Sequence, residues 1–322
     1  MDVRSAPGSQ RRGDRSKAHT RQSSYPLPLD DLEFDRLDQQ HYLLTRILGR
    51  LPRQPAQTGQ TGEVMELRRG LEVGCANGTW VLEAAATWPQ CQWTGIDPVP
   101  AYPAAVHPAN VEFQSGDIVQ GLAFEDGHFD YVHARDIGLG IQLAQWPQVL
   151  REYARLLASG GVLELVEWSL PFLVRPPGDS LGLKGEGMDL EGYRSEDLAM
   201  YAPITARIQQ LLEEALGHLG VDMHLPGNLM SQWWKDASLS ELLHLEHQVP
   251  FGMSHSKYDA EERRMAREVV VGLVREVSRT TMGQQQNGSS SWDEELLEQW
   301  EQELEHVDVA WSLHIFYGRK RW

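Results

Sequence analysis

Two hydrophobic periods alternate along most of this chain, and together they predict a mixed α/β fold. Short apolar runs predict strands, whereas apolar residues that repeat every three or four positions predict the helices between them. The predicted strands cover residues 71–73, 91–97, 111–118, 128–135, 162–168, 242–249 and 309–317. The predicted helices cover residues 30–51, 80–86, 146–157, 203–219, 230–236, 256–282 and 292–306. Strands and helices therefore follow one another as in a doubly wound sheet.

Three segments show neither the apolar runs of strands nor the apolar repeat of helices. Residues 54–63 are rich in Gln, Gly, Thr and Pro and predict a surface loop. Residues 171–196 are rich in Gly and Pro and predict a lid, a binding loop or a disordered excursion. The first residues are basic and almost without apolar side chains, so we expect a disordered basic tail over 1–28. The rest, 29–322, is expected to form one domain with helical insertions at about 171–238 and 254–307.

The first predicted strand ends in a turn with the chemistry of a nucleotide-binding loop. Residues 71–80 read Leu-Glu-Val-Gly-Cys-Ala-Asn-Gly-Thr-Trp, which is a strand, a tight turn and the start of a helix. Gly74 and Gly78 carry no Cβ, so the backbone can turn sharply and approach a ligand. Asp97 follows about twenty positions later, the spacing at which a carboxylate reaches the hydroxyls of a ribose. The alternative is an ordinary strand-to-helix turn.

The residues around this turn favour S-adenosylmethionine (SAM) over a dinucleotide. Ala76 and Thr79 stand where the dinucleotide pattern has its later glycines. Glu72 would repel a pyrophosphate but would suit the ammonium of a methionine group. Asp117, after the third strand, is placed to accept from an adenine amino group, with Ile118 against the ring. The predicted cofactor-binding residues are Glu72, Gly74, Cys75, Ala76, Asn77, Gly78, Asp97, Pro98, Asp117 and Ile118.

The end of the fourth strand and the flanking helices supply candidates for an acceptor site. His133 is the candidate general base, because the ordinary pKa of histidine lies near neutrality; a structural role is the alternative. Arg135 ends the same strand and is a candidate for binding the acceptor. Tyr42, in the helix before the first strand, and Trp233 could cover an acceptor with apolar surface.

Composition narrows the possible partners. The formal net charge of −17 makes a nucleic-acid partner unlikely for the body of the chain. No secretory signal is visible, and no run approaches the length of about 18 apolar residues that a membrane helix needs. The two cysteines, Cys75 and Cys91, form neither a disulfide framework nor a metal-ligand pattern. We therefore expect a cytoplasmic or nuclear protein with no metal and no membrane partner.

Taken together, these residues resemble the seven-stranded, class I SAM-dependent methyltransferases and, more narrowly, the fungal LaeA-like methyltransferases. The motifs that carry the resemblance are Asp35-Arg36-Leu37-Asp38-Gln39-Gln40-His41, residues 71–80, Ile96-Asp97-Pro98, Gly116-Asp117, residues 129–135, residues 159–164 and Tyr317-Gly318-Arg319-Lys320. The resemblance implies a Rossmann-like sheet of seven strands with the last antiparallel, an N-terminal helical cover, and SAM over the carboxyl ends of the first strands. Ala76 and Glu72 depart from the usual glycine and aspartate, which at most weakens cofactor binding.

Two functions remain open from the sequence. The first is methyl transfer from SAM to a small-molecule acceptor, plausibly in fungal secondary metabolism. The second is a regulatory protein that keeps a SAM-binding fold and acts through protein partners; the basic tail and the helical insertion after the sixth strand favour it.

Overall fold

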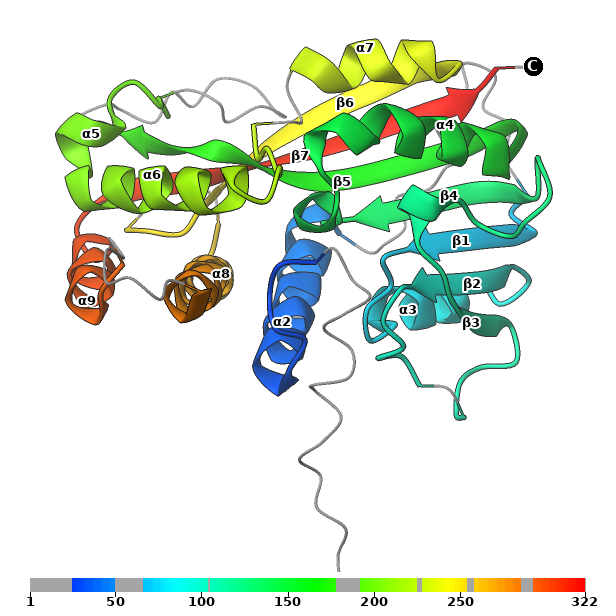
Figure 1. The fold of residues 1–322 in the computed structure, drawn as a ribbon, viewed down its shortest axis with the longest axis horizontal. Coiled ribbons are helices and arrows are strands. Elements are labelled where there is room, and N and C mark those ends of the chain that lie inside the picture. The colour runs from blue at the N-terminus through cyan, green and yellow to red at the C-terminus, as the bar shows by residue number, and fades with distance from the viewer. Residues whose placement is uncertain are drawn as a thin grey trace, which may run out of the picture.

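A mixed sheet lies at the centre of the molecule, with helices packed on both of its faces (Figure 1). The computed structural model describes residues 25–49, 66–103, 105–177, 192–224, 228–253, 258–284 and 292–321. The strands are β1 (Arg69–Val73), β2 (Gln92–Asp97), β3 (Val111–Ser115), β4 (Phe129–Arg135), β5 (Leu157–Arg175), β6 (Leu239–Pro250) and β7 (Asp308–Lys320). An isolated antiparallel bridge between Val174 and Arg194 adds one further extended position outside these strands.

The order of the strands is β3-β2-β1-β4-β5-β7-β6. Strands β1 to β5 pair in parallel, whereas β7 runs antiparallel to both of its neighbours, β5 and β6. The expected Rossmann-like α/β class with an antiparallel last strand is therefore confirmed. Parallel pairing places the carboxyl ends of β1 to β4 at one edge of the sheet, where such folds bind ligands.

Helices cover both faces because each strand carries apolar residues toward both layers. They are α2 (Asp31–Leu48), α3 (Thr79–Thr87), α4 (Trp146–Leu156), α5 (Leu198–Tyr201), α6 (Pro203–Gly217), α7 (Asn228–Asp236), α8 (Ala260–Gln284) and α9 (Glu294–Glu303). Short 3-10 turns are η2 (Ile118–Gln120), η3 (Gly138–Gly140) and η4 (Leu143–Gln145). The helices predicted from the apolar period are present, with ends that differ by a few residues.

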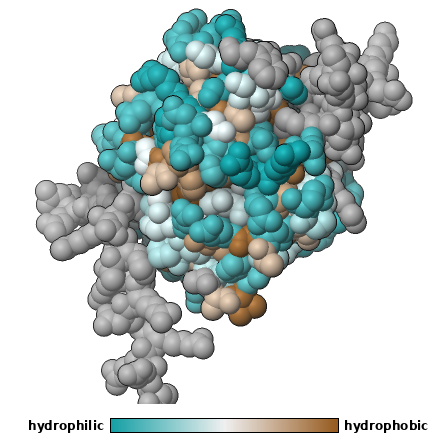
Figure 2. Space-filling view, turned by 90° about the vertical axis from the view of Figure 1, so that its right-hand side faces the viewer, coloured by the Kyte–Doolittle hydropathy of each residue, from teal (hydrophilic) through white to brown (hydrophobic). Residues whose placement is uncertain are grey.

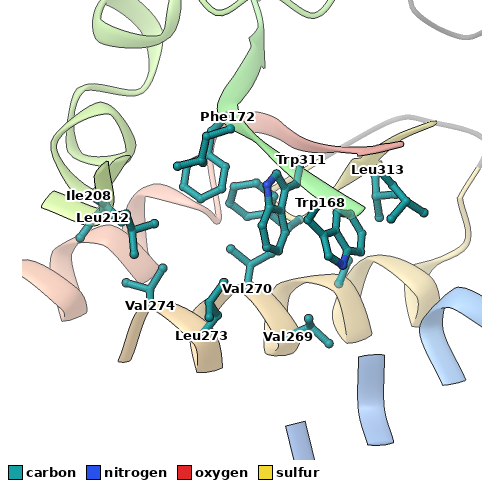
Figure 3. Packing of buried hydrophobic residues seen from close by; sticks show 14 of the residues in the cluster. Trp168, Phe172, Ile208, Leu212, Val269, Val270, Leu273, Val274, Trp311 and Leu313 are labelled. Atoms are coloured by element: carbon teal, nitrogen blue, oxygen red, sulfur yellow. The ribbon is translucent and has the colours of Figure 1, made fainter. Parts of the chain in front are cut away.

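The hydrophobic core has three parts. One cluster joins α4 and α7 to one face of the sheet, and a second packs α3 against β2 to β5 on the other face. The third and largest cluster packs α2, α6, α8 and α9 against the long strands β5 and β7. Figure 3 shows its centre, where the indoles of Trp168 and Trp311 lie above Val270 and Leu273 of α8. The ring centroids of Trp168 and Trp311 are 4.5 Å apart.

Strand β5 differs from its prediction in both directions. It begins at Leu157, directly after α4, so the Ser-Gly-Gly sequence at 159–161 lies within the strand instead of ending a helix. It also continues to Arg175, well past the expected end at residue 168, because Phe172 and Val174 are buried in the largest cluster. Only residues 178–191 of the expected loop fall outside the described residues, as do residues 1–24 of the predicted tail.

One face of the molecule is mostly polar (Figure 2). Figure 2 shows the end of the molecule on the right of Figure 1, where hydrophilic side chains surround small, separate apolar patches. Within the described ranges, none of the helices is long and apolar enough to span a membrane.

We predict that Trp311→Ala destabilises the fold by about 3–5 kcal/mol. Trp311 is buried and stacks on Trp168, so truncation removes contacts and leaves a cavity. Urea unfolding followed by far-UV circular dichroism measures the change. Leu243→Ala on β6 is the control, because Leu243 is 40% exposed and its loss should cost less than about 1 kcal/mol. Equal losses in the two variants would show that the stacked indoles do not contribute as the packing indicates.

Candidate functional site

A cavity opens at the carboxyl edge of the sheet, between the ends of β1 to β4 and the helix α2. Its free volume is about 790 Å³, including the part open to solvent. The cavity is lined by Tyr25, Leu29, Leu37, Val73, Gly74, Ala76, Asp97, Pro98, Gly116, Asp117, Ile118, Val119, Arg135, Asp136, Ile137, Gly140 and Ile141. Seven of the predicted site residues therefore lie together: Gly74, Ala76, Asp97, Pro98, Asp117, Ile118 and Arg135.

The loop after β1 has a backbone that brings it close to the cavity. Gly74 has a φ of +73°, and a Cβ there would lie 2.5 Å from the side chain of Ile137. Ala76 also has a left-handed φ, 47°, and Gly78, which precedes α3, has a φ of +84°. A Cβ at Gly78 would lie 2.6 Å from the ring of Phe113. Both glycines are therefore required by this turn, as the sequence predicts.

Asp97 ties this loop to the end of β2. One carboxylate oxygen accepts from the Ala76 amide at 2.9 Å, and the other accepts from the Val99 amide at 2.8 Å. Burial raises the pKa of Asp97, and the two amides oppose that rise. A carboxylate has about four lone-pair sites, so two remain for hydroxyl groups of a ligand. Asp117 also keeps acceptor sites for a ligand, because among the residues that the structure describes only the Val119 amide donates to one of its oxygens, at 2.9 Å.

Helix α2 lies beside the carboxyl ends of the parallel strands (Figure 1), and its Leu37 lines the cavity. Asp38 accepts from the Asn77 side chain at 2.8 Å and from the Thr79 hydroxyl at 2.7 Å, which joins the helix to the loop after β1. Gln40 donates to Asp136 at 2.6 Å, which joins the helix to the end of β4. The helix expected before the first strand is thus a cover over the carboxyl edge. Asn77 acts through this contact and does not line the cavity.

Arg135 and His41 meet beneath this cover. A guanidinium nitrogen of Arg135 lies 3.2 Å from Nδ1 of His41, and His41 Nε2 lies 3.1 Å from a carboxylate oxygen of Glu83. Arginine only donates, so Nδ1 of His41 is the acceptor and Nε2 carries the proton. Burial and the charge of Arg135 lower the pKa of His41 to about 4, which keeps the ring neutral at pH 7.

Glu72 and His133 are not among the residues that line the cavity, and both are buried. They are directly paired across β1 and β4, and both side chains face α3. The His133 ring is fully buried and stacks on Trp80, with ring centroids 3.7 Å apart. Burial lowers its pKa well below the usual value, so it is a neutral core residue without access to an acceptor. Glu72 accepts from the Val81 amide, and burial raises its pKa to about 8.

The remaining predicted residues also lie away from the cavity lining. Cys75 is buried, and burial raises the pKa of its thiol, which suits a packing role. Tyr42 is 51% exposed on α2 and contacts His41 edge-on. Trp233 lies on α7 and lines a separate cavity between α4, α6 and α7. The structure therefore does not bring Tyr42 and Trp233 together with Arg135.

Asp136 is an acidic residue of the cavity wall that was not predicted from the sequence. It follows Arg135 directly, so the rule that placed Arg135 at the edge of the sheet applies to it as well. Tyr25, Leu29 and Leu37 were also missed, because no local pattern shows which part of the N-terminal region faces the cavity.

Comparison with known proteins agrees with this geometry. Residues 71–161, which run from β1 into β5, match a protein family described as a methyltransferase domain. Over this range the chain therefore resembles a methyltransferase domain. The match covers the loop after β1 and the ends of β2, β3 and β4, which are the elements that line the cavity.

The chain also resembles several curated fungal proteins. The chain is 33% identical over 145 residues to a secondary metabolism regulator, laeA, of Coprinopsis cinerea, covering 45% of this chain and 35% of that protein. It is 29% identical over 169 residues to the methyltransferase str2 of Strobilurus tenacellus, covering 51% and 57%. It is 28% identical over 222 residues to laeA of Aspergillus niger, covering 67% and 56%. The chain thus spans less than two thirds of each of these relatives. The resemblance to LaeA-like proteins and to fungal methyltransferases is confirmed.

The residues at the cavity fit SAM. The donor set suits a molecule with ribose hydroxyls and an adenine amino group, because Asp97 and Asp117 retain acceptor capacity toward the cavity. Gly74 lies beside them and has no side chain. A Cβ at this position would collide with Ile137 in the cavity wall. Bound there, SAM would supply an activated methyl group.

We predict that Glu72→Gln gains stability relative to the wild type as the pH rises from 5 to 8. The folded protein holds a proton on Glu72 up to about pH 8, whereas the unfolded chain releases it near pH 4.5. Unfolding therefore releases a proton in this window, and wild-type stability falls with rising pH. The expected gain is on the order of 2–4 kcal/mol at pH 8.

Urea unfolding at pH 5 and pH 8 measures this effect. Glu66→Gln is the control, because Glu66 is 71% exposed and should show no such trend. A Glu72→Gln difference that stays constant between the two pH values would mean that Glu72 is ionised in the folded protein.

Proposed function

We propose that the protein binds SAM in the cavity at the carboxyl edge and transfers its methyl group to a small-molecule acceptor. The observation that carries the proposal is the placement of Asp97, Asp117 and the glycine turn around one cavity, inside a methyltransferase domain. Asp97 would bind the ribose hydroxyls, Asp117 the adenine amino group, and Ile118 the face of the adenine ring. The backbone at Gly74 and Ala76 would lie along the methionine end.

The chain contributes orientation and exclusion of water to such a reaction. The cover helix α2 closes the cavity opposite the sheet, and its contacts with Asn77, Thr79 and Asp136 hold it in place. Displacement at a sulfonium is accelerated when the acceptor is held in line and water is kept out. Arg135 lies on the same wall, with one guanidinium nitrogen that has no hydrogen-bond partner among the described residues and could orient an acceptor.

The relatives support a small molecule of fungal secondary metabolism as the acceptor class. Str2 and pytC are described as methyltransferases, whereas laeA is described as a regulator of secondary metabolism. A regulatory protein acting through protein partners is therefore the second candidate. The two functions differ in where a transferred methyl group is found.

We predict that the purified protein binds SAM and does not bind NAD in titration calorimetry. Incubation with SAM carrying a deuterated methyl group and a fungal extract should then place the label in the small-molecule fraction, as detected by mass spectrometry. Heat-inactivated protein is the control. Label confined to proteins of the extract, or SAM binding without any transfer, would favour the regulatory function; binding of NAD alone would refute the cofactor assignment.

We predict that Asp97→Ala weakens SAM binding by about 2 kcal/mol or more, roughly thirtyfold, because charge-assisted hydrogen bonds to the ribose are lost. The loss includes the bond that holds the Ala76 amide, so the loop should also loosen. Asp126→Ala is the matched control, since Asp126 is 79% exposed and pairs with Arg155 away from the cavity. A folded Asp97→Ala variant with unchanged affinity would place the ribose elsewhere.

A further inference from the structure

Asp136 has a strained backbone that its surroundings hold in place. Its φ is 55°, in the left-handed region that non-glycine residues rarely adopt. Its amide donates to the carbonyl of Val166 at 2.8 Å. The two oxygens of the buried Glu167 accept from the next two amides, Ile137 at 3.1 Å and Gly138 at 3.2 Å. Such strain persists only where the surrounding structure enforces it, and it is concentrated at functional sites.

The side chain of Asp136 is held just as firmly through one oxygen. Oδ2 accepts from Nε2 of Gln40 at 2.6 Å, and Oε1 of Gln40 accepts from Arg36 at 2.8 Å. Arginine has no acceptor, so the amide of Gln40 has only one possible orientation, with its NH₂ toward Asp136. Arg36 is itself fixed by Glu33, whose two oxygens accept at 2.8 and 2.7 Å.

The other carboxylate oxygen, Oδ1, has no hydrogen-bond partner in the described part of the chain. Asp136 lines the main cavity and also a smaller adjoining one, which Glu167, Trp168 and Met223 line as well. It therefore stands between the proposed cofactor site and the space toward β5. A carboxylate with one oxygen anchored and one open toward a cavity is arranged to receive a donor from a ligand.

The strand order places Asp136 at the reacting end of that cavity. The lining runs from Asp117 after β3, through Asp97 at β2 and Gly74 at β1, to Asp136 at β4. Three strand spacings, about 14 Å, separate the first from the last. With the adenosine held by Asp117 and Asp97, as the proposed function requires, the sulfur end would lie toward Gly74 and Asp136.

We propose that Asp136 is a catalytic residue that accepts, through Oδ1, the hydrogen of an O–H or N–H group at the atom that is methylated. The acceptor is thereby a hydroxyl or amine compound. In the transfer, the bond between the methyl carbon and sulfur breaks and its electron pair stays on sulfur. The bond between the methyl carbon and the acceptor oxygen or nitrogen forms, and the proton passes to Asp136. The inference rests on the proposed function.

The charges around Asp136 are compatible with this role. Burial raises its pKa, and the nearby Arg36 and the bond from Gln40 limit the rise. The raised pKa makes the Asp136 carboxylate a better proton acceptor than an exposed one. Arg36 is paired with Glu33, so its charge does not cancel that of Asp136.

Binding of three ligands tests the proposal without knowledge of the acceptor. The probes are SAM, S-adenosylhomocysteine, which lacks the methyl group and is neutral at sulfur, and sinefungin, which carries an ammonium where SAM carries the methyl-bearing sulfonium. In calorimetry, Asp136→Asn should weaken sinefungin binding by about tenfold or more, because a charge-assisted hydrogen bond is lost. SAM should weaken less, and S-adenosylhomocysteine should change by less than about twofold.

Asp117→Asn is the matched control, because it alters the adenine end and should weaken all three ligands equally. Asparagine tolerates a left-handed backbone and can accept the bond from Gln40, so Asp136→Asn is expected to fold. Asp136→Gly, which suits the left-handed φ best, should reproduce the same selective loss.

The outcomes separate this inference from the proposed function. If the wild type binds none of the three ligands, the proposed function is refuted and this inference with it. If the wild type binds all three, but both Asp136 variants change their affinities equally or leave them unchanged, only the role of Asp136 is refuted. A loss confined to sinefungin and SAM supports it.

Discussion

Hydrogen bonds from one stretch of α2 hold the helix across the carboxyl ends of β1 and β4, and the cavity depends on them. Asp38 binds the loop after β1, Gln40 binds Asp136, and His41 contacts Arg135. Without this cover, the ends of the strands would face solvent. Electrostatic interactions at the edge would then be weaker, because water screens charges far better than a protein interior does.

The same helix requires a buried ion pair, and the rest of the structure is arranged around it. Arg36 is 5% exposed and Glu33 is completely buried, so each needs the other as a partner. Helix α8 packs against α2 at this point, where Gly272 leaves room for the stem of Arg36: a Cβ there would lie 3.3 Å from it. Arg279 of α8 also binds Asp30 at the start of α2. Helix α8 therefore supports the cavity wall and also covers the long strands β5 and β7.

Left-handed backbone occurs at three residues that line the cavity, Gly74, Ala76 and Asp136. Ala76 and Asp136 are two of the three non-glycine residues with positive φ in the described part of the chain. For the two non-glycine residues this conformation costs on the order of 1 kcal/mol or more, and in each case buried hydrogen bonds maintain it. The molecule thus holds backbone and carboxylate groups in fixed positions before any ligand binds, which is the condition for orienting two reactants.

The sequence alone determined the α/β class, the helices and the residues that directly follow each parallel strand. Asp97, Asp117 and Arg135 could be predicted together because the carboxyl ends of parallel strands share one edge, whatever the packing. Asp136 was within reach of the same rule. The glycine turn was predictable because the positive φ values exclude most side chains there.

Only the tertiary structure decided which face each residue within a strand points to and what packs on it. Glu72 and His133 stand one or two positions from the edge, and the pairing of β1 with β4 turns both toward α3, into the core. The contacts of α2 are equally invisible in the sequence, since Gln40 and Asp136 are 96 residues apart and meet only once the sheet has formed. Local periodicity indicates which segments form helices and strands, but a contact between distant elements depends on the registers of all the strands between them.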